Sequence, residues 1–545
     1  MKKLLSLLMI MLLLVGCSGG NNGGGGDAAP ADGGSDAVTV VTLQAPTPLI
    51  SMDPVVVTDG TSFSALTMCF SGLMSLDADG NPVPDAAESF TVSDDGTLYT
   101  FKLRDGAVWS NGDPVTANDF VYAWDRMRSE ESAADYAFLW DICAVESYKA
   151  VDDLTFEVKL SSPSGFFLGL TAFPSMFPIN AKVAQEKGDQ YALSTGDMVY
   201  NGPYTMTGWT AGYSFEFEQN PTYWDAANFD ANYAKKVIFR EITDTQTALM
   251  EYESGNLDTV SLSGEQVDAN SSAPGFVNRL AGYMYYLTIN MGNNHHNRTG
   301  AADLSNANIR KAISFAIDRE EIARVLNDGS VAAGGIVPID LAANPATGAD
   351  FREDQGYIVS YDEAKAKDFY AKGVAELGHD VTFDLLYGSD EGDSIIKAAE
   401  QVQSYLEAVG FTVNLNPKPK KERLDLAGTA DDHDYDVMLT RWGPDYADPQ
   451  TYMDLFLTES VDYNDGGYSS EVYDSLVHDA EFGAGVSDAN MRWSLFLEAE
   501  KQLIVEDAAV VPVFQAGGAM IISPKISGIE FHSAAVDSYR HIVVK

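Results

Sequence analysis

Residues 381–415, VTFDLLYGSDEGDSIIKAAEQVQSYLEAVGFTVNL, contain two changes of hydrophobic period. Apolar side chains first recur at every second position, over residues 381–385, which predicts a strand. They then recur at helical spacing, which predicts a helix that stops at Gly410, because glycine commonly ends helices. From Phe411 onward apolar side chains again occupy every second position, which predicts a second strand. A strand, a helix and a strand in this order predict a parallel sheet with a right-handed crossover. We therefore expect an α/β fold.

The next predicted strand, residues 435–439, runs into a loop with the sequence Arg441-Trp442-Gly443-Pro444-Asp445-Tyr446-Ala447-Asp448-Pro449. Its glycine and two prolines predict a sharp, rigid turn. Ligands of open α/β sheets bind at the carboxyl ends of strands, so this loop follows the strand at a ligand-binding edge. A carboxylate between aromatic side chains, as Asp445 is, can pair with an ammonium group and shield it from water. For the nonapeptide alone, an Asp-Pro turn beside a core tryptophan is the simpler interpretation.

The N-terminus has the pattern of an exported protein. A basic start, Met1-Lys2-Lys3, precedes an apolar run of about a dozen residues, which is shorter than the roughly 20 needed to span a bilayer. The run ends in Leu14-Val15-Gly16-Cys17, which resembles the lipobox of bacterial lipoproteins; an ordinary signal with an incidental cysteine is the alternative. We predict a signal peptide over residues 1–16, lipidation of Cys17, and a flexible lipid-anchored linker over residues 17–37.

Composition and charge exclude some classes of partner. The chain has 545 residues, enough for two or three domains, and carries 34 basic against 80 acidic residues, a net charge of −46. A surface this acidic repels nucleic acid and anionic lipid, so we expect no nucleic-acid partner. The same charge mildly favours cationic ligands.

Sequence patterns that would indicate catalysis or metal binding are absent from the chain. It contains no Gly-x-Ser-x-Gly elbow, phosphate loop or HExxH motif, so we expect no enzyme, no cofactor and no metal site. We interpret His295-His296 as a polar loop rather than a metal site. Cys69 and Cys143 have apolar neighbours, which favours buried free thiols over a disulfide.

Residues 86–124, AAESFTVSDDGTLYTFKLRDGAVWSNGDPVTANDFVYAW, predict a hairpin followed by a helix. Thr116 with Asp119 has the spacing of a capping box at the start of that helix, and Ser360 with Glu363 has the same spacing later in the chain. This 39-residue segment resembles the signature of the extracellular solute-binding proteins of family 5, and the resemblance extends over roughly residues 38–545.

The resemblance implies a periplasmic-binding-protein-like fold of type II, in the three-subdomain oligopeptide-binding class, with a cleft between two lobes. It places the first lobe at residues 38–285, with an inserted subdomain at about 70–197. The second lobe follows at residues 286–507, and residues 508–545 return to the first lobe. Two crossings between the lobes suit a hinge that closes around a ligand.

The resemblance also assigns site residues. The family carries a Trp-x-x-Asp-Tyr-x-Asp-Pro pattern late in its second lobe, and its first Asp, here Asp445, takes the α-ammonium of a bound oligopeptide. Asp448 is expected to fix its own turn instead. We add the neighbours of Asp445 and two residues at a segment resembling the family's Gly-Pro-Tyr turn as ligand-binding candidates: Arg441, Trp442, Tyr446, Asn201 and Tyr204.

Two details of the site stay open. Pro46, Thr47 and Pro48 occupy the region in which some enteric relatives add a glutamate, so no second acidic contact to the amine is assigned. The run containing Tyr283, Tyr285 and Tyr286 fits a cleft wall and strand packing equally well.

The resulting expectation is a monomeric, lipid-anchored receptor at the extracytoplasmic face of the bacterial cell membrane. It would capture oligopeptides and deliver them to the permease subunits of an ABC importer. The alternatives are a family-5 receptor for a metal chelate, haem or a glycan, and a secreted hydrolase of peptides or glycans.

The lipobox generates a prediction about anchoring. The wild-type protein should label with palmitate and fractionate with membranes, because acyl chains contribute about 0.8 kcal/mol per buried CH₂ and two or three chains hold a protein on a bilayer. Cys17→Ala should do neither, whereas Cys143→Ala, which removes a predicted buried thiol, should behave as the wild type. Equal labelling of the wild type and Cys17→Ala would contradict the assignment.

Overall fold

The computed structural model describes residues 39–545 except 79, 130–133, 293–302, 429–433, 445, 461–462, 487 and 534–535. The predicted signal peptide and linker with Cys17, the pair His295-His296 and Asp445 therefore lie outside the described residues. In the part of the chain that is described, no helix has the length and apolar character needed to cross a membrane.

A seven-stranded sheet contains the stretch 381–415. Its elements are β11 (Thr259–Leu262), β12 (Phe276–Ile289), β13 (Val331–Ala332), β14 (Thr382–Gly388), β15 (Thr412–Lys418), β16 (Val437–Trp442) and β17 (Val510–Ile522). The strand order is β11-β17-β12-β16-β14-β15, with β13 paired to β17. β14 and β15 are parallel and are connected by helix α13 (Asp393–Val409), as the hydrophobic periods predict, and β14 is also parallel to β16. The predicted α/β fold class is confirmed.

Two four-stranded sheets form most of the N-terminal half. One has the order β1-β10-β9-β8 and the other β4-β5-β7-β6. The bounds are β1 (Val40–Ala45), β4 (Ala87–Val92), β5 (Leu98–Leu103), β6 (Val145–Asp152), β7 (Thr155–Leu160), β8 (Tyr204–Thr210), β9 (Ser214–Gln219) and β10 (Lys236–Glu241). β4 and β5 are the predicted hairpin. Helix α2 (Ala117–Met127) starts at the predicted capping box, where the Asp119 carboxylate accepts the backbone N–H of Thr116 at 2.8 Å.

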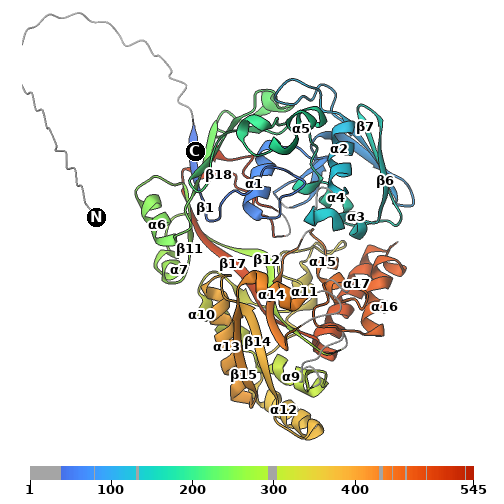
Figure 1. Cartoon of the computed structure of the whole chain (residues 1–545), viewed down its shortest axis with the longest axis vertical. Helices are drawn as coiled ribbons and strands as arrows, with labels where there is room; N and C mark the ends of the chain where they lie inside the picture. Colours follow the sequence, from blue (N-terminus) through green and yellow to red (C-terminus); the bar gives the residue numbers. More distant parts are fainter. Residues whose placement is uncertain are drawn as a thin grey trace, which may run out of the picture. The chain divides into compact units, whose positions relative to one another are not determined.

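The remaining elements surround these sheets (Figure 1). The helices of the N-terminal half are α1 (Gly60–Cys69), α3 (Leu139–Ile142), α4 (Phe167–Leu170), α5 (Ala181–Lys187), α6 (Thr245–Glu253) and α7 (Glu265–Asn270). Those that follow are α9 (Ala307–Ala316), α10 (Arg319–Leu326), α11 (Phe351–Gln355), α12 (Glu363–Leu377), α14 (Lys420–Ala427), α15 (Gln450–Met453), α16 (Glu471–Glu481) and α17 (Ala489–Lys501). Short strands are β2 (Met74–Leu76), β3 (Pro82–Pro84), β18 (Ile526–Ser527) and β19 (Val543–Val544).

Separate hydrophobic cores form around the N-terminal sheets and around the seven-stranded sheet. The first core draws almost all its buried residues from positions 41–239, and it also contains Tyr446, Ile526 and Ile542 from far along the chain. The second core packs α9, α10 and α13 against β14–β16. Cys69 and Cys143 are buried free thiols in the first core, as predicted. The residues after β17 thus return to the first core.

The long strands β12 and β17 lie side by side where the chain passes between these cores (Figure 1). Their antiparallel register is interrupted between Leu280 and Met284 and again at Tyr285. The predicted lobe boundary at residues 285/286 falls inside β12, and the boundary at 507/508 falls just before β17. The division into lobes at those residues stays a prediction.

The second predicted capping box is wrong about the capping residue. Helix α12 begins after Asp362, whose side chain accepts the backbone N–H of Lys365 at 2.9 Å. The backbone N–H of Asp362 donates to the carbonyl of Phe315 at 2.9 Å. This contact with the end of α9 fixes Asp362 rather than Ser360 at the helix start, and the local pattern does not contain it.

A buried ion pair fixes the segment that follows β13. The Glu500 carboxylate is fully buried, pairs with Arg352, and accepts the backbone N–H groups of Ile336 and Val337 at 2.9 and 3.0 Å. Arg352 also donates to the carbonyl of Val337 at 2.9 Å. The two charges therefore neutralise each other and hold the 336–337 backbone in place.

Removing the acid should strand a buried charge. Glu500→Ala should lower the free energy of unfolding by about 3–5 kcal/mol, because the Arg352 guanidinium loses its counter-ion and two backbone N–H groups lose their acceptor. Glu363→Ala is the control, since Glu363 pairs with Lys367 on the exposed face of α12 and should matter far less. Urea unfolding measures both. Equal losses in the two variants would show that the buried pair adds nothing to stability.

Candidate functional site

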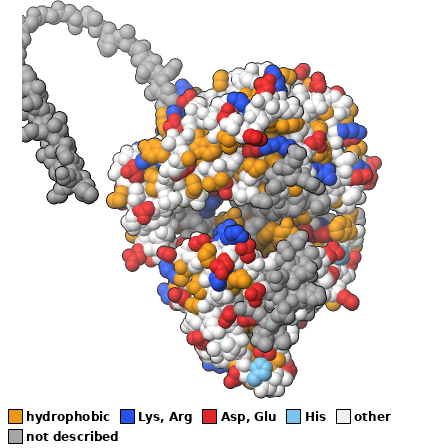
Figure 2. Space-filling model, viewed as in Figure 1, with side chains coloured by type: hydrophobic (Ala, Val, Ile, Leu, Met, Phe, Trp, Pro, Cys, Tyr) orange, Lys and Arg blue, Asp and Glu red, His pale blue; other side chains and the backbone are white. Residues whose placement is uncertain are grey.

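Two adjoining cavities are lined by residues from distant parts of the chain. The first has a volume of about 580 Å³ and the second about 780 Å³. They share four lining residues, so they are neighbours: Phe173, His532, Ser533 and Val536. The molecular face in Figure 2 is hollowed across its middle, and acidic side chains are scattered both above and below the hollow.

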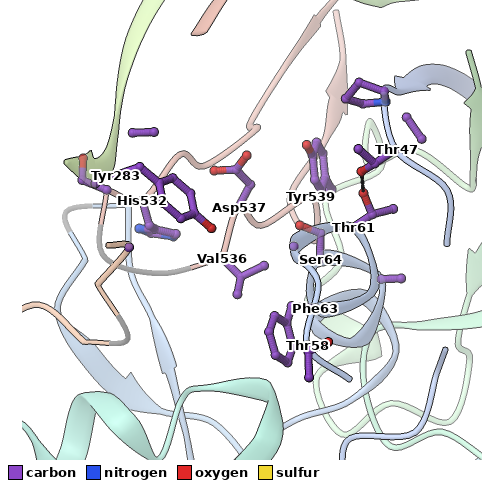
Figure 3. Close-up of a pocket in the computed structure, with 18 of the residues that line it drawn as sticks. Thr47, Thr58, Thr61, Phe63, Ser64, Tyr283, His532, Val536, Asp537 and Tyr539 are labelled. Carbon is purple, nitrogen blue, oxygen red and sulfur yellow. Dashed lines mark hydrogen bonds between the residues drawn. The ribbon is translucent and has the colours of Figure 1, made fainter. Parts of the chain in front are cut away.

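The first cavity combines hydroxyl groups, aromatic rings and one ion pair. Figure 3 shows Thr47, Thr61 and Tyr539 on one side of it, with Tyr283 and His532 opposite and Asp537 between them. The Asp537 carboxylate pairs with Arg279 of β12 at 2.5 Å. Burial raises the pKa of Asp537, and Arg279 acts against that rise. The cavity wall therefore offers hydrogen-bonding groups but little net charge.

The loop after β16 contributes to both cavities. Trp442, Gly443 and Pro444 line the first cavity, whereas Tyr446 and Ala447 line the second. The predicted turn thus follows the strand end as expected, and its residues are divided between the two spaces. Asp445, which stands between these groups in the sequence, lies outside the described residues.

Tyr446 joins this loop to the first core. Its ring stacks on Phe166 with a centroid distance of 3.8 Å and an interplanar angle of 9°. Only 4% of Tyr446 is exposed, and burial raises the pKa of its hydroxyl. The stack connects a loop of the seven-stranded sheet to the segment just before α4, and both rings line the second cavity.

Arg441 does not line either cavity among the described residues. Its Nη1 donates to the Tyr285 hydroxyl at 2.7 Å, and its guanidinium lies 5.0 Å from the centre of the Tyr283 ring. Tyr283 is 45% exposed and lines the first cavity. Tyr285 stacks on Phe514 and is buried, as is Tyr286. Both interpretations of the tyrosine run are therefore correct, each for different members.

Comparison with known proteins identifies the family. The profile of the bacterial extracellular solute-binding proteins, family 5 Middle, matches residues 81–464. The chain belongs to this family. A dipeptide-binding protein from Lactococcus lactis subsp. cremoris (strain MG1363) is 33% identical over 517 residues, which cover 90% of this chain and 92% of that protein. The oligopeptide-binding protein OppA of Bacillus subtilis (strain 168) is 30% identical over 506 residues, covering 88% of each.

Solved structures of similar proteins share the fold. The substrate-binding domain of an oligopeptide ABC transporter from Bacillus anthracis str. Ames has a TM-score of 0.76 and 34% identity, covering 93% of this chain and 99% of its own. OppA of Listeria monocytogenes, solved bound to peptide, has a TM-score of 0.75 and 32% identity. The match covers 93% of this chain and 99% of that one. These likenesses confirm the two-lobe α/β fold of the solute-binding family.

Two of the candidate residues that the family pattern suggested are buried away from the cavities. Asn201 is 3% exposed and forms two hydrogen bonds with the backbone of Ser71, each 3.0 Å long. Tyr204 is 1% exposed, and its hydroxyl donates to the carbonyl of Ala234 at 2.8 Å. Their side chains thus stabilise the start of β8 in this structure, and we leave them out of the proposed site.

Asp448 fixes the far end of the loop, as the sequence predicts. Its carboxylate accepts the backbone N–H of Gln450 at 2.9 Å. It also forms a two-pronged pair with the Arg492 guanidinium of α17, at 2.7 and 2.8 Å. Bidentate pairs of this kind fix orientation as well as charge, so the loop is held against α17.

Sequence reasoning missed the segment 531–540, which contributes three of the four residues shared by both cavities: His532, Ser533 and Val536. It also missed Phe166 and Asp340 as cavity residues. The described residues of this segment, 531–533 and 536–540, form no helix or strand, so they offer no hydrophobic period to detect. No cluster of three or more metal-ligating side chains occurs in the described part of the chain.

The ring stack generates a prediction. Phe166→Leu and Tyr446→Leu should show a coupling of about 0.5–1.5 kcal/mol in the free energy of unfolding, because either change alone removes the same stack. Urea unfolding of the wild type, both single variants and the double variant measures it. Phe369 of α12 packs against the second core, so Phe166→Leu and Phe369→Leu should be additive. Additivity in both pairs would mean that the stack contributes no interaction of its own.

Proposed function

We propose that this chain captures oligopeptides in its two adjoining cavities and delivers them to the permease of an ABC importer. The proposal rests on the position of the loop after β16. This loop lines both cavities, and it follows the strand at whose end the family binds its ligand. Support comes from relatives described as dipeptide- and oligopeptide-binding proteins, one of them solved with a bound peptide. The proposed activity is binding without catalysis.

The cavity walls suit a ligand recognised mainly by its shared groups. A receptor for many sequences must use the backbone and the termini, and extended peptides pair their backbone groups with a cleft wall. Hydroxyl groups such as Thr58 and Ser64 offer partners for peptide amides, and rings such as Phe63 offer an apolar surface. The two volumes together leave room for side chains of different sizes.

Asp445 is proposed as the partner of the peptide's α-ammonium. Support comes from the chain on either side of it, since Pro444 lines the first cavity and Tyr446 the second. The sequence adds the Trp-x-x-Asp-Tyr-x-Asp-Pro pattern, which is complete here. Trp442 and Tyr446 are proposed to form the aromatic walls, and Arg441 to support Tyr283 and Tyr285 beneath them.

The remaining proposals concern location and assembly. We propose that Cys17 carries a lipid anchor, that the protein acts as a monomer at the extracytoplasmic face of the membrane, and that β12 and β17 form the hinge. Support for this location comes from the lipobox-like sequence before Cys17 and from the family of extracellular proteins to which the chain belongs. Support for the hinge comes from the register shifts in the β12–β17 pair.

The test of the function is a calorimetric double cycle with a tight-binding peptide. Asp445→Asn should weaken binding of the free-amine peptide by roughly 10- to 100-fold, because a charge-assisted hydrogen bond contributes about 1.5–3 kcal/mol. N-acetylation of the peptide should weaken wild-type binding by a similar factor, since it removes the other charge of the same pair.

Combining both changes should cost far less than the sum of the two losses, because each deletes one side of a single interaction. Additive losses would show that Asp445 does not hold the amine. Peptide that is cleaved rather than retained during the titration would contradict the binding function itself.

A further inference from the structure

Nearly every described charge that lines the two cavities is already neutralised by a protein partner. Arg279 pairs with Asp537 at 2.5 Å in the first cavity. Arg540 lines the second cavity and pairs with the buried Asp85 at 2.8 Å. Burial lowers the pKa of His532, which borders both cavities, and this favours the neutral form of the ring. The described walls therefore present no unpaired cation to a ligand.

Asp340 is the exception among the described lining residues. It lines the second cavity, it is exposed, and its carboxylate has no ion-pair or hydrogen-bond partner within the described part of the chain. Its neighbours in the same wall, Leu341, Ala342 and Ala343, are apolar. A carboxylate beside an apolar wall is less well screened by water than one on an open surface, so it attracts a cation more strongly.

The backbone holds Asp340 in a defined position. Its φ of 62° lies in the left-handed region, which aspartate and asparagine tolerate better than most residues. Its own N–H donates to an Asp350 carboxylate oxygen at 2.9 Å. The preceding residue, Ile339, is bound at both its N–H and its carbonyl by the side-chain amide of Gln515, at 2.9 and 3.0 Å.

Gln515 connects this wall to the strand pair between the lobes. It lies on β17, is 1% exposed, and donates as well to the carbonyl of Ala281 on β12 at 3.0 Å. The segment carrying Asp340 is thus fixed to both crossing strands by one buried side chain. The backbone at Asp340 therefore needs no ordering when a ligand binds, and only the rotamers of the side chain remain to be fixed.

We propose that Asp340 is a specificity residue that favours peptides with a lysine or arginine side chain in the second cavity and disfavours acidic ones there. This inference rests on the proposed function and adds a side-chain preference to it. The preference comes from one unpaired carboxylate on a fixed backbone, in a cavity whose described cations are all paired. It is distinct from recognition of the peptide's terminal amine.

A lysine scan of the ligand tests the proposal. A set of peptides of one length carries lysine at each internal position in turn, and a matched set carries norleucine, which has a similar length without the charge. At one position lysine should bind the wild type about three- to tenfold more tightly than norleucine, as expected for one partly screened ion pair. Glutamate at that position should bind more weakly than norleucine, and added salt should reduce both differences.

The matched variants are Asp340→Asn and Asp189→Asn. Asparagine also tolerates the left-handed backbone, so Asp340→Asn should fold as the wild type does, with an unchanged melting temperature, and should lose the lysine preference. Asp189 is exposed and lines neither cavity, so Asp189→Asn should keep the preference although it removes the same formal charge.

The outcomes separate this inference from the function on which it rests. Tight binding of the neutral peptides with the lysine preference unchanged in Asp340→Asn would overturn the assignment to Asp340. Equal binding of lysine and norleucine peptides at every position would overturn the charge preference. Absence of binding by any peptide in the set would overturn the proposed function and this inference with it.

Discussion

The antiparallel pairing of β12 with β17 is the constraint on which the rest of the structure depends. β12 carries β16 on its other edge, and β16 in turn positions the loop that lines both cavities. Beyond β17, the chain returns to the first core through Ile526 and Ile542. Three of the four residues shared by both cavities, His532, Ser533 and Val536, lie on that return. One strand pair thus brings together cavity walls that are far apart in the sequence.

The backbone of this pair is also unusually closely packed on the side of the cavities. A Cβ on Gly282 would lie 2.1 Å from the carbonyl oxygen of Ser533 and 2.5 Å from Pro444. Distances this short leave no space for any side chain, so glycine is required where β12 passes beneath the loop and the returning segment. The interrupted register between Leu280 and Met284 occurs at the same place.

Features set by local chemistry could be predicted from the sequence, whereas those set by distant contacts could not. The strand, helix and strand of residues 381–415 follow from hydrophobic period alone, and the turn at Gly443 follows from its glycine and prolines. Asp362 replaces Ser360 as a cap because Phe315 binds its N–H, a contact made across 47 residues of chain. Likewise, the sequence around Tyr446 contains no sign of its partner Phe166.

In the candidate site, too, local chemistry could be predicted from the sequence and distant contacts could not. Trp442 and Tyr446 could be assigned as cavity walls because they flank the turn, but Asn201 and Tyr204 belong to a motif whose side chains bind backbone groups inside the first core. A motif match therefore located a structural turn correctly without showing whether its side chains reach solvent. Asp340 could not be predicted from sequence patterns, because its proposed role depends on which other charges in the cavity walls are already paired.

The position of Tyr446 within the first core has a thermodynamic consequence for ligand exchange. Any motion that separates Tyr446 from Phe166 exposes two largely buried aromatic faces to water. Exposure of apolar surface raises the heat capacity, so an opening motion that parts these two rings would carry a positive heat-capacity change that originates in the protein itself. The enthalpy of ligand release then varies with temperature even for a wholly polar ligand, and a calorimetric signature of apolar burial would not by itself indicate an apolar ligand.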